Sequence, residues 1–172
     1  MKGCMAIDRQ KTETVHWHAV FTASRAEKKV RDRLEELGVE CFLPVQTVLR
    51  QWTYRKSRVV VPVIAGLVFV RVGRQEQVKV LQTKGVVAFL RLKGEAGAAV
   101  IPDKQMEDFR FLLDFSEEAV EMTNENIKAG DLVRVVKGSL RGMEGELIRH
   151  KGVTKVLVRI DMLGCAMVNI PA

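Results

Sequence analysis

The residues that could do chemistry in this 172-residue chain are few, and they do not converge. His16 and His18 share one face of an expected strand, which suits two metal ligands, but no third ligand is close, and His150 is remote. The pairs Glu35–Glu36 and Glu117–Glu118 fall on expected exposed segments and form no acid and base pair. No nucleophile-elbow, phosphate-loop or dinucleotide pattern occurs. We therefore expect no catalytic residue, no metal and no cofactor, and a protein that is not an enzyme. A metal-dependent enzyme using the two neighbouring histidines is the alternative.

Cys4, Cys41 and Cys165 form no CxxC pair and have no histidine at metal-ligand spacing. This odd, scattered set, in a chain whose start lacks the apolar core of a secretory signal, indicates a reducing compartment, and we expect a cytoplasmic protein. We expect Cys41 and Cys165 to be small buried hydrophobic residues. No apolar stretch approaches the ~18 residues that a membrane-spanning helix needs, so we expect no membrane partner.

The net charge of +7 is spread unevenly along the chain. Residues 1–115 hold 20 basic and 13 acidic residues, residues 116–126 hold four glutamates and no basic residue, and residues 127–172 hold 8 basic and 4 acidic residues. Two basic blocks around an acidic strip predict two domains, each suited to a polyanion; a solvated basic surface is the alternative. We expect a flexible leader at 1–14, a domain at 15–115, an acidic linker at 116–126 and a second domain at 127–172.

The first elements carry a row of basic residues. Residues 15–23 alternate as a strand does, and residues 24–38 predict a helix with Ser24 as its N-cap, Glu27 in a capping box and Gly38 just after its end. Three basic residues recur every four positions along this helix: Arg25, Lys29 and Arg33. Such a ridge either binds a polyanion or is a solvated face.

A β-hairpin with a basic and aromatic tip is expected next. Residues 39–52 predict one strand, residues 53–58 a turn and residues 59–72 a second strand, kinked at Pro62 and Gly66. The tip carries two aromatic and four basic residues: Trp52, Tyr54, Arg50, Arg55, Lys56 and Arg58. Aromatic rings among guanidinium groups suit contacts with bases and phosphates. The alternative is a hairpin whose two aromatic residues pack against each other across the strands.

The remaining periodicities complete an α+β chain. Residues 76–85 predict a short helix, residues 86–91 a strand, and residues 101–115 a helix whose apolar face holds Met106, Phe109 and Leu113. The order β-α-β-β-α-β-α predicts a ferredoxin-like sandwich with helices on one face of the sheet. Four short alternating segments, which predict a small SH3-like β-barrel, follow at 131–136, 143–150, 153–160 and 165–170.

The stretch LVRVVKGSLRGMEGELI, residues 132–148, places Gly138, Gly142 and Gly145 between two expected strands. Glycine reaches positive φ without steric cost and lets another backbone or a ligand approach closely. We expect these glycines to shape a turn first and to form a contact surface second. Arg141 at the turn is a candidate contact, with a solvated arginine as the alternative.

These patterns resemble a known family. The glycine stretch resembles a KOW motif, matched at Gly130, Asp131, Val133, Val135, Gly138, Gly142, Gly145 and Leu147. Residues 15–115 resemble an NGN domain through the strand at Trp17, the following helix, and the segments PVIAGLVFV, TKGVVAFLR and IPDKQMEDF. A chain with an NGN domain followed by a KOW domain resembles NusG-type transcription elongation factors. The segments VIPDKQMEDFRFLLD and VRIDMLGCAMVNI are similar to UpxY-type antiterminators of capsule polysaccharide operons.

The resemblance implies a cytoplasmic, monomeric factor that suppresses pausing or termination. It implies docking on the clamp helices of RNA polymerase, and contact with the opposite jaw, through Trp17, Phe21, Ile64, Leu67, Phe69, Gln77 and Lys79. It also implies that the basic ridge, with Lys84, faces non-template DNA. The predicted contacts with DNA or nascent RNA, hairpin included, are Arg25, Lys29, Arg33, Arg55, Lys56, Arg58 and Lys84. The KOW domain would engage a ribosomal protein, a termination factor or RNA.

The docking segment departs from the family pattern, because Ile64, Ala65 and Leu67 replace its usual aromatic and proline residues. The surface stays apolar, but aromatic edge contacts are lost. A stand-alone KOW protein that binds RNA or the ribosome is the alternative function. Exposure of Leu67 and Phe69 separates the two: a polymerase factor needs this apolar patch exposed, whereas an RNA-only binder would bury it. We expect it to be exposed.

Overall fold

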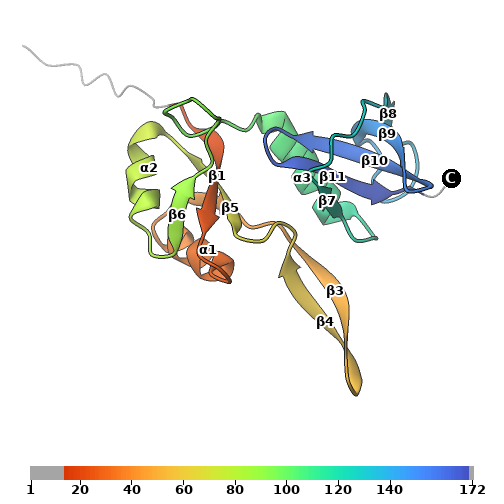
Figure 1. Ribbon diagram of the computed structural model, residues 1–172, viewed down its shortest axis with the longest axis horizontal. Coiled ribbons are helices and arrows are strands. Elements are labelled where there is room, and N and C mark those ends of the chain that lie inside the picture. Colours follow the sequence, from red (N-terminus) through yellow and green to blue (C-terminus); the bar gives the residue numbers. More distant parts are fainter. Residues whose placement is uncertain (1–13, 171–172) are drawn as a thin grey trace, which may run out of the picture.

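A computed structural model describes residues 14–170 (Figure 1). Cys4 and all but the last residue of the predicted leader lie outside this range. The first part of the chain forms an antiparallel sheet in the order β2-β5-β1-β6. Its elements and their connecting helices are β1 (His16–Thr22), α1 (Glu27–Glu36), β2 (Glu40–Phe42), β5 (Leu67–Val72), α2 (Arg74–Leu81) and β6 (Val86–Phe89).

Helices cover both faces of this sheet, so the prediction of helices on one face was wrong. Helices α1 and α2 pack on the face that carries Val20 and Val68. Helix α3 (Asp103–Phe115) packs on the other face, which carries Trp17 and Phe69. The physical reason is that β5 is apolar on both sides, since four consecutive residues, from Leu67 to Val70, are buried.

The ends of the helices confirm some of the predicted capping residues and contradict others. Helix α1 begins at Glu27 after Ala26, without a side-chain cap, so the predicted Ser24 N-cap was wrong. Oε1 of Glu27 instead accepts a hydrogen bond of 2.8 Å from the N–H of Gly66. Gly38 does follow the helix with a φ of +74°, as predicted. In α3 the residue buried beside Met106 and Phe109 is Leu112, whereas Leu113 is half-buried.

Strands β3 (Val45–Trp52) and β4 (Arg55–Pro62) form a separate hairpin that projects from the molecule (Figure 1). The sequence predicted one strand over 39–52, but Pro44 lacks the N–H that a continuous ladder needs, and β2 ends before it. The turn is only Thr53 and Tyr54, shorter than predicted, because Trp52 pairs with Arg55. The predicted strand over 59–72 divides between β4 and β5.

The last part of the chain is a five-stranded antiparallel sheet in the order β7-β11-β10-β9-β8. Its strands are β7 (Glu121–Thr123), β8 (Asp131–Arg134), β9 (Glu144–His150), β10 (Val153–Ile160) and β11 (Gly164–Asn169). The four predicted strands are confirmed. Strand β7 was not predicted; it lies in the glutamate-rich segment expected as a linker and pairs with β11. Part of that segment therefore belongs to this sheet.

Helix α3 joins the two parts through a shared hydrophobic core. The ring of Phe109 lies 6.1 Å from that of Phe69 in β5. The same core contains Val156 and Ile160 of β10. Oε1 of Gln105 accepts a hydrogen bond of 2.8 Å from the N–H of Asp161, just beyond β10. The two sheets are thus packed on one helix.

Candidate binding surfaces

The apolar patch predicted to be exposed is mostly buried. Trp17 is 5% exposed, Leu67 2% and Phe69 0%. All three belong to the core shared with α3, whose Arg110 guanidinium also lies 5.8 Å from the centre of the Trp17 ring. The expectation of an exposed hollow around Leu67 and Phe69 was therefore wrong. The physical reason is that α3 occupies this face, and a local motif does not say which distant helix covers it.

One end of this face remains open. Phe21 points to the same face as Trp17 and Ala19, because side chains alternate along β1, yet it is 40% exposed. It pairs with Leu67 on one side and with Ala88 of β6 on the other. Ile64, in the connection before β5, is half-buried against the same core. Phe21 and Ile64 are the two predicted docking residues that retain accessible surface on this face.

The predicted contacts in α2 lie in the opposite layer. Gln77 is half-buried, and Lys79 is exposed. Nζ of Lys79 donates a hydrogen bond of 2.8 Å to the carbonyl oxygen of Leu37 at the end of α1. The structure therefore places Gln77 and Lys79 on the other side of the four-stranded sheet from Phe21.

The predicted basic ridge forms one surface with Lys84. Arg25 and Lys29 are exposed, and Arg25 has a φ of +59° just before α1. Nη1 of Arg33 donates a hydrogen bond of 2.7 Å to the carbonyl oxygen of Lys84, 51 residues away in sequence. This bond joins Lys84 to the ridge at Arg33, two residues that the sequence placed in separate segments.

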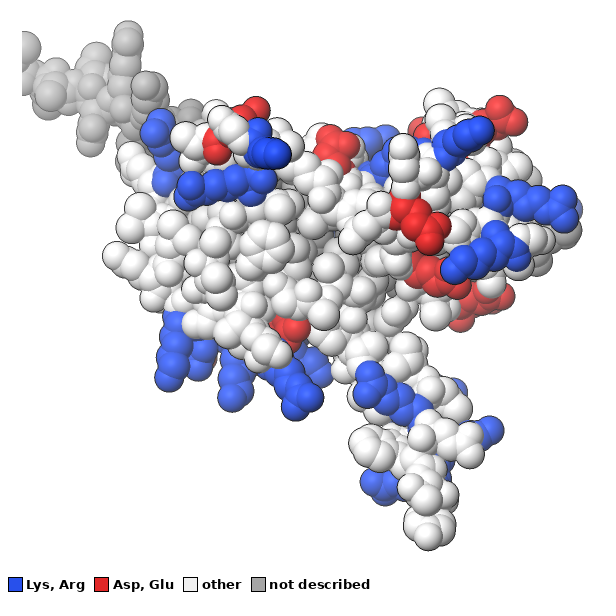
Figure 2. Space-filling view, in the orientation of Figure 1, with Lys and Arg blue, Asp and Glu red and all other residues white. Residues whose placement is uncertain are grey.

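The ridge and the hairpin lie on the same side of the molecule. Figure 2 shows basic side chains gathered along the edge where α1 lies and along the projecting hairpin. Arg55, Lys56 and Arg58 are exposed on β4. Nζ of Lys28 donates a hydrogen bond of 3.3 Å to the carbonyl oxygen of Val60, which connects α1 to the base of β4. Lys28 adjoins the predicted ridge, but its role as a link required a contact that spacing along the helix cannot reveal.

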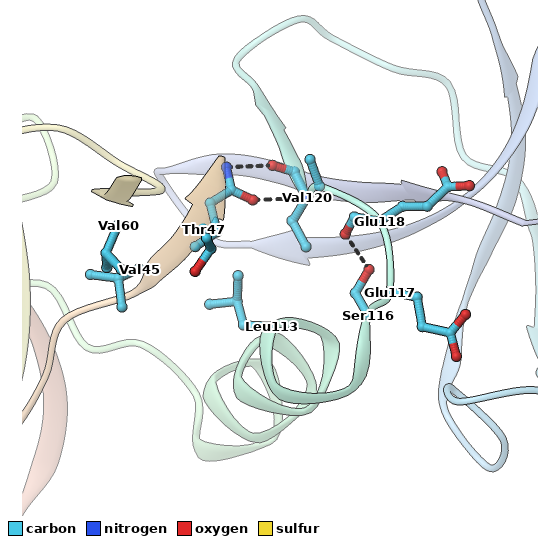
Figure 3. Close-up of a pocket in the computed structure, with 10 residues that line it drawn as sticks. Val45, Thr47, Val60, Leu113, Ser116, Glu117, Glu118 and Val120 are labelled. Atoms are coloured by element: carbon cyan, nitrogen blue, oxygen red, sulfur yellow. Dashed lines mark hydrogen bonds between the residues drawn. The ribbon is translucent and has the colours of Figure 1, made fainter. Parts of the chain in front are cut away.

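A pocket of about 450 Å³ lies at the base of the hairpin (Figure 3). The side-chain amide of Gln46 makes two hydrogen bonds with the backbone of Val120, accepting from its N–H at 3.0 Å and donating to its carbonyl at 3.3 Å. This pair of bonds connects β3 to the segment that leads into β7. The lining is Val45, Gln46, Thr47, Val60, Leu113, Ser116, Glu117, Glu118, Ala119 and Val120.

The glycines between β8 and β9 have two different roles. Gly138 and Gly142 adopt φ values of +83° and +90°, which favour glycine. The N–H of Gly142 donates a hydrogen bond of 2.8 Å to the carbonyl of Val135, which closes the turn. Gly145 lies within β9, where a Cβ atom would be 2.7 Å from Cγ1 of Val156. Arg141 is exposed at the turn. Close packing, rather than turn geometry, therefore explains Gly145.

The side chains of His18 and Cys41 are engaged in the fold, whereas that of His16 is not buried. Nδ1 of His18 donates a hydrogen bond of 2.8 Å to the carbonyl oxygen of Ala99, and burial lowers its pKa. His16 on the same strand is exposed. Burial and the nearby Glu35 carboxylate raise the pKa of Cys41 to about 11, which keeps the thiol protonated. Within residues 14–170, no group of three or more histidine, cysteine or acidic side chains is placed to hold a metal ion.

Comparisons with known proteins place this mixed α/β chain in a family. The family model described as "Transcription termination factor nusG" matches residues 15–110. The chain therefore belongs to the NusG family of transcription factors. No curated protein sequence matches it. No helix within the described residues is long and apolar enough to cross a lipid bilayer.

Solved structures that resemble the chain include a NusG structure and an Spt4:Spt5 complex. The structure titled "Domain interaction in Thermotoga maritima NusG" is 21% identical, with a TM-score of 0.49, over 91% of this chain and 93% of that one. Conformation B of the MjSpt4:Spt5 complex is 17% identical, with a TM-score of 0.31, over 91% of this chain and 99% of that one.

Proposed function

We propose that this NusG-family chain is a cytoplasmic, monomeric transcription elongation and antitermination factor that acts by binding, without metal or cofactor. The family match over residues 15–110 carries the proposal. The strand order β2-β5-β1-β6, with α1 and α2 on one face, supports a ferredoxin-like NGN domain at 15–115. The four strands β8 to β11 support a KOW domain of SH3-like type at 127–172, and β7, within the acidic segment, adds a fifth strand to their sheet. The segments VIPDKQMEDFRFLLD and VRIDMLGCAMVNI suggest a UpxY-type factor of capsule polysaccharide operons.

RNA polymerase docks, in this proposal, on the open end of the apolar face. Phe21 and Ile64 provide the accessible contacts, because they are the predicted docking residues that keep exposed surface on this face. Trp17, Leu67 and Phe69 hold this end in shape from within the core. An exposed aromatic ring on an apolar sheet face suits the clamp helices of the polymerase as a small hydrophobic contact.

The opposite layer of the sheet gives the factor a second contact. In this proposal Gln77 and Lys79 contact the opposite jaw of the polymerase, and their position on α2, which packs on the face opposite Phe21, supports it. A protein that touches both jaws stabilises the closed clamp relative to the open one, which shifts the population away from paused states. The basic residues near α1, together with Arg55, Lys56 and Arg58, then face non-template DNA or nascent RNA.

The C-terminal sheet offers a separate contact for a ribosomal protein or a termination factor. Arg141 is exposed on a turn in which Gly138 and Gly142 adopt positive φ and which the bond from Gly142 to Val135 closes. A charged side chain on an exposed turn suits recognition by a partner protein.

A stand-alone RNA-binding or ribosome-associated KOW protein is the second candidate. The burial of Leu67 and Phe69 favours it, because a protein that binds RNA alone has no need of an exposed apolar patch and relies on its charge.

Binding to purified RNA polymerase core enzyme separates the two candidates. We expect Phe21→Asp to weaken polymerase binding at least tenfold, because a carboxylate replaces the accessible ring at the centre of the contact. Leu132→Asp is the matched control, since Leu132 is an exposed apolar residue on β8. Its affinity should equal that of the wild type. The same proteins are then added to transcription reactions on templates with and without a terminator, where wild-type protein should increase read-through.

Absence of polymerase binding by the wild type, with RNA binding retained, would support the second candidate instead. Equal affinities for Phe21→Asp and Leu132→Asp would exclude the open end of the face as the docking site.

A further inference from the structure

We propose that the β3–β4 hairpin is a binding site for single-stranded nucleic acid, in which Trp52 and Tyr54 stack on unpaired bases. The inference deepens the nucleic-acid contact of the proposed function and can be tested without polymerase.

The hairpin has no core of its own. No residue from Val45 to Trp52 or from Arg55 to Pro62 is buried. A two-stranded hairpin alone is at best marginally stable in water. The outer half of this one projects away from the rest of the described chain (Figure 1). An exposed hairpin of this length is best explained by a surface that a partner covers.

The strand register places an aromatic ring beside two guanidinium groups. Trp52 pairs directly with Arg55, so their side chains lie on the same face of the hairpin. Arg50, two residues before Trp52, lies on that face as well. Tyr54 lies in the two-residue turn beyond them. Trp52 is 56% exposed and Tyr54 98%, so the alternative in which the two rings pack across the strands was wrong.

The charge of the hairpin suits a polyanion. Residues 45–62 hold four basic and no acidic residue, and the chain has no acidic residue between Glu40 and Glu76. None of these four basic side chains forms a salt bridge within residues 14–170. Unpaired guanidinium and ammonium groups on an exposed element are available to phosphates.

The exposed rings indicate a single strand rather than a duplex. In a duplex the bases stack on one another and their faces are covered, whereas an unpaired base can stack on an aromatic ring. Stacking of this kind tolerates any sequence, because every base has a π-face. Basic residues alone would bind both forms, so Trp52 and Tyr54 are what would distinguish the single strand.

The site continues from the hairpin to α1. The bond from Lys28 to the carbonyl of Val60 connects the two elements, and the basic residues of both lie on one side of the molecule (Figure 2). A strand of eight residues is about 26 Å long at ~3.3 Å per residue. That length accommodates roughly eight nucleotides at the ~3.4 Å spacing of stacked bases. A nucleic-acid strand bound at the tip of the hairpin can therefore reach the basic ridge at Lys29.

The test is fluorescence anisotropy with labelled 12-nucleotide single strands of DNA and of RNA, of one mixed sequence, and with the matching DNA duplex. Wild-type protein should bind a single strand more tightly than the duplex. Trp52→Ala combined with Tyr54→Ala should weaken single-strand binding at least fivefold, since stacking on each base contributes that much or more. Leu49→Ala, an exposed apolar truncation on the other face of the hairpin, is the matched control and should leave affinity unchanged.

Two further readouts separate stacking from charge. The salt dependence of binding should be the same in the aromatic double variant as in the wild type, whereas Arg50→Gln with Arg55→Gln should reduce its slope by about 1.4, or ~0.7 per phosphate contact. Binding should also quench tryptophan fluorescence. The chain has two tryptophans and Trp17 is buried, so the quenching should disappear in Trp52→Ala.

Tighter binding of RNA would identify the nascent transcript as the ligand, and tighter binding of DNA the displaced strand; either result supports the site. Equal affinity for single strand and duplex, or unchanged affinity in the aromatic variant, would overturn it. Loss of polymerase binding in that variant with unchanged oligonucleotide affinity would overturn it too, and would make the hairpin a protein contact. The polymerase contact at Phe21 is tested separately, by Phe21→Asp.

Discussion

At the scale of single residues, His18 illustrates how a candidate ligand becomes part of the core. Its ring is buried, bonds to the carbonyl of Ala99, and meets the ring of Phe89 edge-on with 5.8 Å between centres. The bond uses the Nδ1 proton of a neutral imidazole. Because burial is the largest cause of its lowered pKa, the neutral form is the one that the fold stabilises.

We expect NMR titration to give His18 a pKa below the ordinary histidine value of about 6.5. The unfolded chain then binds this proton at a higher pH than the folded chain does. The free energy of unfolding should therefore decrease as pH falls through about 6.5, and the effect is absent at higher pH. Measuring wild type and His18→Gln between pH 8 and pH 5 isolates this contribution. A His18 pKa above the value measured in urea would contradict the assignment.

At the scale of elements, Gly145 decides how closely β9 and β10 pack. A Cβ atom there would lie 2.7 Å from Cγ1 of Val156 and 2.9 Å from the carbonyl oxygen of Leu157. The second of these is backbone within the sheet and has little freedom to move. The glycine is needed for space, not for an unusual φ.

Gly145→Val should destabilise the C-terminal sheet by ~1–3 kcal/mol, the usual range for overpacking a core. Gly97→Val is the matched control, because a Cβ at Gly97 meets nothing within 4 Å and its φ is not in the positive range. Urea unfolding of the two variants measures the difference. Equal midpoints for both would refute the close approach.

At the scale of the whole molecule, α3 makes two sheets interdependent. Phe109 lies in the core next to Phe69 and Phe42, at ring distances of 6.1 and 6.4 Å. The same helix buries Met106 and Leu112 in a core that contains Val158 of β10. The helix therefore contributes to the stability of both parts.

Phe109→Ala should cost ~3–5 kcal/mol, since it removes a fully buried ring. Hydrogen exchange should then increase at Val68 in β5 and at Val158 in β10 together. Phe115→Ala on the same helix is the control. Because Phe115 is half exposed, this variant should lose much less stability. Faster exchange confined to one sheet would show that the two sheets do not share a core.

The sequence predicted most elements because their signals are local. Alternation identified β1 and the four later strands of the C-terminal sheet, and Gly38 identified the end of α1. The recurrence of basic residues every four positions placed Lys29 on the basic ridge. The Ser24 cap failed because Glu27 bonds to Gly66, a residue that is distant in sequence. Strand β7 was missed because three residues among glutamates carry almost no periodic signal.

Sequence by itself thus determined most of the elements, the basic spacing and the family resemblance, since these depend on neighbouring residues and composition. Tertiary structure alone decided that α3 covers Leu67 and Phe69, that Phe21 stays accessible, and that the hairpin joins α1 in one basic surface. Burial depends on which distant segment fills a face. An apolar residue has the same local pattern whether a helix or a partner protein covers it.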